Sequence, residues 1–151
     1  MPILQPQDEE AVRERFESEL TGDVKITLVT HNPIGGLLIP GRDCPSCPTT
    51  QELIEVVVAL SPKIHLEIVD FYRDSETAKS LGVDKIPAVV VHDSDDGGAK
   101  FYGLPSGFEF PVLLDAIVAA STKVSGLSEA ALEALAQVME DVHIQVFVTP
   151  T

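Results

Sequence analysis

Apolar residues recur along the chain with two periods, one typical of helices and one typical of strands. Residues 8–20 carry Val12, Phe16 and Leu20 at every fourth position among charged residues, which predicts an amphipathic helix. The next segment, VKITLVT at 24–30, is rich in β-branched residues and predicts a buried strand. The chain therefore opens with a helix followed by a strand.

The same two periods continue through the first 122 residues. They predict three further helices: one from the cysteines to about residue 60, one over 75–82, and one over 106–120 that opens on the capping pattern Ser106-x-x-Glu109. Three further strands are predicted, at 63–70, 87–92 and 99–103. Because a helix connects the first two strands, we expect these to be parallel. The order of elements predicts an α/β fold, with a mixed four-stranded sheet flanked by helices.

The end of the chain repeats the pattern of its beginning. A second amphipathic helix carries Leu132, Leu135 and Met139, and the residues Asp-Val-x-Ile-x-Val at 141–146 match Asp-Val-x-Ile-x-Leu at 23–28. Such internal similarity suggests a duplicated unit. We therefore expect one unit over 1–122, followed over 123–151 by a linker and the first helix and strand of a second, incomplete unit. The chain would be a fragment of a longer two-unit protein, or would form a homodimer through its C-terminal strand.

Composition and charge restrict the class of protein. The 151 residues are 44% hydrophobic and 23% charged, as in globular proteins. No apolar run is long enough to span a bilayer, and the N-terminus lacks the pattern of a signal peptide, so we expect a cytoplasmic protein without a membrane partner. The net charge of −14 disfavours nucleic acid and anionic membranes, because phosphate binding needs an excess of Lys and Arg.

Cys44 and Cys47 are the only cysteines and form a CxxC motif at the predicted start of a helix. In a reducing compartment such a pair is more often catalytic or metal-binding than structural. A zinc site needs four nitrogen or sulfur ligands, whereas the four histidines are scattered without ligand spacing. Zinc shared between two chains and an inert pair of buried thiols are the alternatives. We favour a reactive dithiol and expect neither a metal nor a cofactor.

The prolines after the two cysteines leave two helix starts open. If Cys44 caps the helix and Pro45 is its first residue, the helix dipole favours a thiolate at Cys44. If Cys47 caps the helix and Pro48 is its first residue, that advantage is weaker. Arg42 should stabilise a thiolate at the motif, and Asp43 should destabilise it. The residues that we expect to tune the thiols are Arg42, Asp43, Pro45 and Ser46.

Ile86 and Pro87 come directly before the apolar strand residues Ala-Val-Val-Val. Only about 5% of X–Pro bonds are cis. A cis bond downstream of a CxxC motif would turn the backbone of Ile86 toward the site, where its N–H and carbonyl could pair with an extended substrate. We therefore expect a cis bond here.

Several segments resemble the thioredoxin/glutaredoxin superfamily: the CxxC after a first strand, the strand LEIVDF, and LGVDKIPAVVV. FYGLPSGFEF at 101–110 and VHIQVFVTPT at 142–151 resemble the glutaredoxin-like protein disulfide oxidoreductases of thermophilic prokaryotes, which carry two thioredoxin-fold units. The resemblance implies a thioredoxin fold, with Cys44 as the exposed nucleophile and Cys47 as the resolving thiol. It also implies that Pro87 is a cis-proline facing them and that Ile86 binds substrate through its backbone.

The function implied by the resemblance is a dithiol–disulfide oxidoreductase. Its partners would be disulfide-containing proteins and a thioredoxin-reductase-like or other thiol reductant. The alternative function is a non-catalytic docking or electron-relay module of a larger assembly. The segment 31–43 is longer than in the family, and its apolar part, IGGLLIP at 34–40, could cover the site. The acid that thioredoxins bury on the central strand is missing.

Overall fold

The computed structural model describes residues 2–33, 39–94 and 97–149. Its strands form one mixed sheet in the order β2-β1-β3-β4. The strands are β1 (Val24–Thr30), β2 (Ile64–Asp70), β3 (Ala88–Ser94) and β4 (Gly97–Tyr102). The helices are α1 (Pro6–Glu19), α2 (Cys47–Ala59), α3 (Ser75–Ser80), α4 (Glu109–Thr122) and α5 (Glu129–Leu135). β1 is parallel to β2 and antiparallel to β3, which is antiparallel to β4, so the predicted mixed four-stranded sheet is confirmed.

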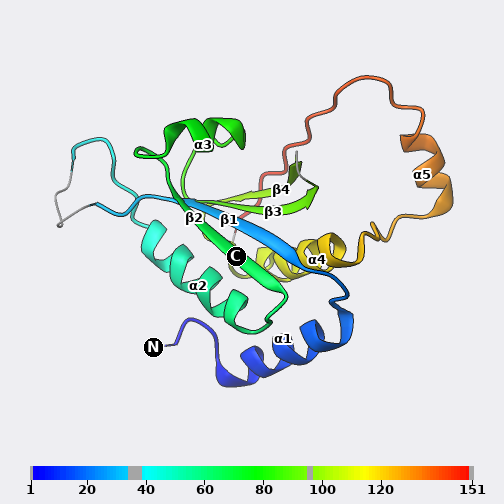
Figure 1. The fold of residues 1–151 in the computed structure, drawn as a ribbon, viewed down its shortest axis with the longest axis horizontal. Coiled ribbons are helices and arrows are strands. Elements are labelled where there is room, and N and C mark those ends of the chain that lie inside the picture. Colours follow the sequence, from blue (N-terminus) through cyan, green and yellow to red (C-terminus); the bar gives the residue numbers. More distant parts are fainter. Residues whose placement is uncertain (1, 34–38, 95–96, 150–151) are drawn as a thin grey trace.

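Helices cover both faces of the sheet, which explains why every residue of β1 except Lys25 is buried (Figure 1). α1, α2 and α4 pack on one face, where Phe16, Ile54 and Ile117 meet Ile26 and Leu28 of β1. The short α3 and the residues after it pack on the other face, against Val29 and Val69 in a smaller cluster. A strand buried on both faces needs apolar side chains in both directions, and β1 has them.

The N-terminal end of β1 is held by Ser121 of α4. The backbone N–H groups of Thr21 and Gly22 donate to the Ser121 hydroxyl oxygen at 3.0 and 2.9 Å, and the hydroxyl donates to the Gly22 carbonyl at 2.6 Å. These bonds fix where the strand begins. The capping pattern predicted at the other end of α4 is wrong, because α4 begins at Glu109 with no side-chain cap, and Glu109 N–H donates to the Ser106 carbonyl at 3.2 Å.

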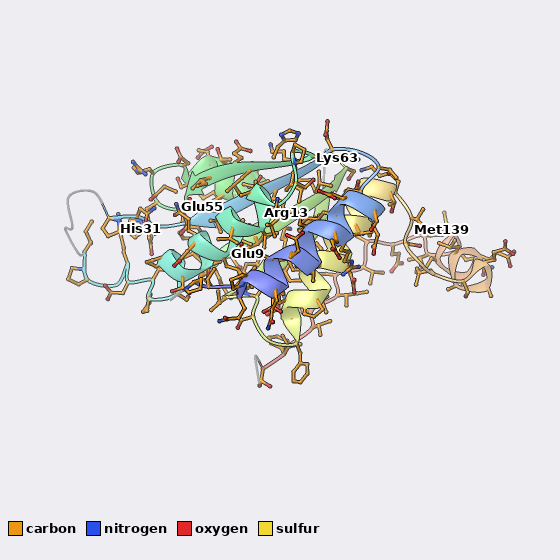
Figure 2. The ribbon with its side chains drawn as sticks, turned by 90° about the horizontal axis from the view of Figure 1, so that it is seen from below. Glu9, Arg13, His31, Glu55, Lys63 and Met139 are labelled. Atoms are coloured by element: carbon orange, nitrogen blue, oxygen red, sulfur yellow. A yellow bond between two sulfur atoms is a disulfide. The ribbon has the colours of Figure 1, made fainter. Side chains whose placement is uncertain are left out.

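The tail carries α5 away from the packed body, and the residues after α5 return toward that body (Figure 1). There Ile144, Val146 and Val148 line a cavity together with Phe101 and Phe108. The predicted helix is present as α5, but it has no buried residue. The predicted strand after it is not formed: residues 141–149 belong to no strand, and Ile144, Val146 and Phe147 are largely exposed. A strand needs a neighbouring strand to bond its backbone groups, and no described strand pairs with this segment. Figure 2 shows His31 and Met139 at opposite ends of the molecule. No described helix has the length and apolar character to cross a membrane.

Candidate active site

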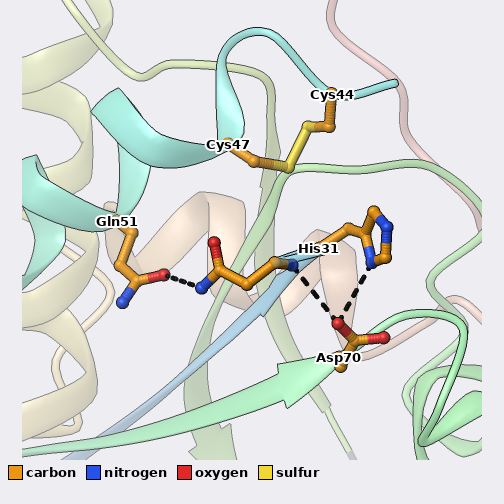
Figure 3. Close-up of a disulfide and its surroundings, with 6 residues drawn as sticks. His31, Cys44, Cys47, Gln51 and Asp70 are labelled. Carbon is orange, nitrogen blue, oxygen red and sulfur yellow. Dashed lines mark hydrogen bonds and ion pairs between the residues drawn. A yellow bond between two sulfur atoms is a disulfide. The ribbon is translucent and has the colours of Figure 1, made fainter. Parts of the chain in front are cut away.

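The CxxC motif forms a disulfide just where α2 begins (Figure 3). Cys44 and Cys47 are joined with their Cα atoms 5.3 Å apart. Ser46 is the N-cap and Cys47 the first helical residue, so the helix start that makes Cys44 the cap is wrong, and the second start lies within one residue of the observed one. A helix starting at Pro45 would place Pro48 fourth, where its missing N–H forfeits the first intrahelical bond. Cys44 lies in the preceding turn, its carbonyl accepting Cys47 N–H at 3.2 Å.

The two cysteines differ in exposure. Cys47 is fully buried under α2, whereas Cys44 is half-buried. Cys44 also lines a cavity of about 360 Å³, together with His31, Arg42, Asp43 and neighbouring residues. An incoming group can therefore reach Cys44 but not Cys47. Of the apolar segment expected to cover the site, residues 34–38 lie outside the described residues, and Ile39 lines the cavity.

The peptide bond between Ile86 and Pro87 is cis, as expected from the sequence. Val29 pairs with Ala88 at the end of the β1–β3 ladder, so Ile86 and Pro87 lie just before β3 at the same edge of the sheet where His31 follows β1. Pro87 is buried, and its carbonyl accepts Gly103 N–H at 2.9 Å. The backbone N–H and carbonyl of Ile86 make no hydrogen bond with any described residue.

The four residues expected to tune the thiols lie around the motif, but only one has a distinct contact. The Arg42 guanidinium lies 4.5 Å from the centre of the Tyr72 ring, a distance at which a cation is attracted to the ring face. Asp43 and Pro45 are exposed and line the cavity with Arg42. Ser46 caps α2 by position, without a side-chain hydrogen bond.

Asp70, at the end of β2, is a buried carboxylate at the edge of the site; its side chain is 4% exposed. Its two oxygens accept backbone N–H groups of Arg73, Tyr72 and Asn32 at 3.0, 3.1 and 3.3 Å, and the His31 Nδ1 lies 3.1 Å away. Burial raises the pKa of this carboxyl, but these hydrogen bonds outweigh burial and hold the pKa below its ordinary value. Asp70 is therefore ionised near neutral pH.

The family of the chain is decided by a match to a known domain. A family model for the thioredoxin domain matches residues 37–115, more than half of the chain. The chain belongs to the thioredoxin domain family. The matched residues run from just before the CxxC motif through β4 and into α4, and they include the cis bond before Pro87. No curated protein matches the chain.

Solved structures place this thioredoxin domain protein among similar folds. A protein disulfide oxidoreductase from Aeropyrum pernix K1 has a TM-score of 0.74 and 22% identity over 88% of this chain and 54% of that chain. The alkylhydroperoxide reductase AhpF of Enterococcus faecalis V583 has a TM-score of 0.70 and 20% identity over 86% of this chain and 58% of that chain. The chain thus spans little more than half the length of either. The resemblance to thioredoxin and glutaredoxin-like proteins is confirmed for family and fold.

Sequence reasoning missed Asp70, and it treated His31 only as one of four scattered histidines. The parallel pairing of β1 with β2 sets Thr30 opposite Asp70, so His31 and Asp70 meet at the edge where both strands end. Parallel pairing was expected, and noting which polar residues end the two strands would have found this pair. Within the described residues, no three His, Cys, Asp or Glu side chains are arranged to hold a metal ion.

Proposed function

We propose that this thioredoxin domain protein is a dithiol–disulfide oxidoreductase that acts on protein disulfides. The observation that carries the proposal is the unequal burial of a bonded CxxC pair: Cys44 borders a cavity while Cys47 is buried behind it. In the reduced protein the Cys44 thiolate attacks a substrate disulfide and forms a mixed disulfide. Cys47 then attacks the Cys44 sulfur, which releases the reduced substrate and closes the Cys44–Cys47 disulfide.

Ile86 and Pro87 are proposed to hold the substrate chain beside Cys44. The backbone N–H and carbonyl of Ile86 bond to no residue in the described part of the chain, which supports this role, because an extended peptide can pair with them as it would with a strand edge. The buried Pro87, bonded through its carbonyl to Gly103, keeps that backbone in place. Arg42, Asp43, Pro45 and Ser46 surround the reacting sulfur and are proposed to tune it, with Arg42 restrained by the Tyr72 ring.

Reduction of insulin disulfides by dithiothreitol, with and without the protein, tests the proposal. The wild-type protein should accelerate reduction, and Cys44→Ser should lose the acceleration entirely because the attacking sulfur is gone. Cys47→Ser, reduced, freed of dithiothreitol and then mixed with insulin, should instead accumulate a mixed disulfide, which gel electrophoresis without reductant detects. If the wild type is no faster than Cys44→Ser, the enzyme hypothesis fails and the non-catalytic docking or electron-relay module becomes the better description.

The cycle needs a reductant to restore the dithiol. We propose a thioredoxin-reductase-like protein or another thiol reductant in the cytoplasm, where thiol systems keep such pairs reduced. The short cycle of attack and release requires no cofactor on this chain.

We also propose that residues 123–151 begin a second thioredoxin-like unit after the unit at 1–122. Ile144, Val146 and Phe147 are 80%, 77% and 91% exposed, although their segment repeats the pattern of the buried β1. A strand with this pattern is stable only when neighbours cover it, whether from a continuation of the chain or from a second copy. Sedimentation of the 151-residue chain distinguishes these sources: a dimer that Ile144→Asp dissociates would identify the second copy.

A further inference from the structure

His31 is held in one orientation at the edge of the Cys44 cavity. Its side chain is 12% exposed, its Nδ1 lies 3.1 Å from an oxygen of Asp70, and its ring meets the Tyr72 ring edge-on with centroids 4.8 Å apart. Figure 3 shows the ring beside the Asp70 carboxylate, on the same side of the strands as the disulfide. A carboxylate on one side and an aromatic ring on another leave the imidazole little freedom.

The hydrogen bond to Asp70 decides which ring nitrogen carries the proton of neutral His31. An ionised carboxylate only accepts hydrogen bonds, and the donors around Asp70 keep it ionised. The proton therefore lies on Nδ1, and Nε2 presents a lone pair. Among the described residues, Nε2 has no hydrogen-bond partner, so it is free to exchange a proton with a neighbour.

The residue after His31 fastens this segment to the start of α2, beside the cysteines. Asn32 donates its backbone N–H to Asp70 at 3.3 Å and its side-chain Nδ2 to Gln51 Oε1 at 3.0 Å (Figure 3). Gln51 lies about one helical turn after Cys47. His31 is thus fixed between the end of β2 and the first turns of α2, and both His31 and Cys44 line the same cavity.

We propose that His31 is a further catalytic residue, which exchanges a proton with the Cys44 sulfur, and that Asp70 is the positioning residue that orients it. This inference rests on the proposed oxidoreductase function. In the reduced protein, Nε2 takes the proton of the Cys44 thiol and leaves a thiolate beside an imidazolium. The thiolate bonds to one sulfur of the substrate disulfide, the other sulfur leaves as a thiolate, and the imidazolium returns the proton to it.

The two electrons and both protons balance over the cycle. Cys47, which is buried, attacks the Cys44 sulfur, and the second substrate sulfur leaves with the proton that the Cys47 thiol gives up. The protein dithiol is oxidised to a disulfide, and the substrate disulfide is reduced to two thiols. His31 needs to hold only one proton between the first attack and the first departure.

Some charged groups of the neighbouring segments favour a positive charge on the His31 ring, and others oppose it. Asp70 at the end of β2 stabilises it, and Asp43 beside the motif acts in the same sense. Arg42 and Arg73 oppose it, although Arg42 is placed over the Tyr72 ring and Arg73 lies 3.6 Å from the Asp70 carboxylate. Of these groups, Asp70 is the one that bonds the ring directly.

The test measures alkylation of Cys44 by iodoacetamide between pH 5 and pH 9, in reduced protein carrying Cys47→Ser so that one thiol reacts. An opposite charge within a few ångströms shifts a titration by about 1–3 pH units. His31→Gln should therefore move the half-maximal pH of alkylation upward by about one unit and lower the rate at pH 6 about tenfold. Asp70→Asn should give a smaller shift in the same direction.

His65→Gln is the matched control, because His65 also lies beside an aspartate, Asp23, at 3.6 Å but at the opposite end of the same strands. It should leave the alkylation profile unchanged. If His31→Gln gives the same profile as His65→Gln, the proposal is overturned. The assay contains no substrate disulfide, so this failure is distinct from failure of insulin reduction in the wild type.

A second measurement needs no variant at His31. The imidazole NMR resonances of the wild-type protein are titrated in the oxidised and the reduced state. Proton exchange with Cys44 predicts that the His31 resonances titrate at higher pH after reduction, because a thiolate then forms in the cavity that both residues line, while the His65 resonances should not differ between the two states. Equal His31 titrations in the two states would contradict the proposal even if substitution of His31 unfolds the protein.

Discussion

The two ends of the parallel β1–β2 pair each bring a histidine beside an aspartate, in opposite environments. At the C-terminal end, the side chains of His31 and Asp70 are 12% and 4% exposed. At the N-terminal end, those of His65 and Asp23 are 61% and 76% exposed. An exposed ion pair contributes about 0–1 kcal/mol, whereas a buried carboxylate must be fully bonded to be tolerated. The same two residue types form a surface pair at one end and an organised site at the other.

The difference comes from the segments that connect to the strands at each edge. Parallel strands end at the same edge, and there the chain after β1 leads to the CxxC motif while the chain after β2 turns into α3. That turn directs the N–H groups of Tyr72 and Arg73 at Asp70. At the opposite edge, α4 supplies Ser121, which bonds the backbone before β1. The segments that follow β1 and β2 therefore build the site at one edge of the sheet, while the Ser121 hydroxyl anchors the chain at the opposite edge.

Replacing the aspartate at each end of the β1–β2 pair should give the largest difference in stability between the two ends. Asp70→Ala leaves three backbone N–H groups and the His31 ring without their buried acceptor, and should lower the free energy of unfolding by about 3 kcal/mol. Asp23→Ala should change it by less than about 0.5 kcal/mol. Urea unfolding of the oxidised proteins measures both. Equal stability of the two variants would show that the Asp70 bonds do not hold the site.

A second pair of substitutions tests how the polar groups at each end are satisfied. Ser121→Ala should lower the free energy of unfolding by about 1–2 kcal/mol, because two N–H groups lose their acceptor. At the site end, Thr50 on α2 has a buried hydroxyl without a partner in the described part of the chain. Thr50→Val should therefore be neutral or stabilise by up to about 1 kcal/mol. Thermal unfolding in one buffer compares the two, and a destabilised Thr50→Val would indicate a hydrogen bond to that hydroxyl.

The smallest expected effect is a pH dependence of stability that arises at Asp70 and has no counterpart at Asp23. The pKa of Asp70 is below its ordinary value in the folded protein, so the unfolded chain takes up a proton at this carboxyl at higher pH than the folded protein does. Its stabilising contribution is complete above the ordinary range of an aspartate, near pH 4, and is lost as pH falls through the folded-state pKa. Urea unfolding from pH 6 to pH 3 should show a shallower acid loss for Asp70→Asn than for wild type. Asp23→Asn, the exposed control, should follow the wild-type curve.

The hydrophobic pattern was sufficient to predict the strands of the sheet, because a buried strand carries apolar residues that are close together in the sequence. VKITLVT predicts a strand covered on both faces, and β1 is one. The helix start was not predictable in the same way, because Pro45 and Pro48 each suit a first turn and only the packed structure chose Ser46 as the cap. The tail pattern at 141–146 predicted a strand that is not formed, since pattern alone cannot supply the neighbouring strand.

Residues adjacent in the chain were enough to predict the main elements and the CxxC motif, because each of these features has a local signature. The cis bond before Pro87 was expected only in combination with the CxxC motif upstream and the family resemblance. Long-range packing settled which cysteine is reachable and which acid lies beside the site. Cys44 and Cys47 look alike in the sequence, but only α2 packing buries one of them. His31 and Asp70 are 39 positions apart and meet because β1 and β2 are parallel and in register. Exposure and charge pairing arise from such distant contacts, which no local pattern records.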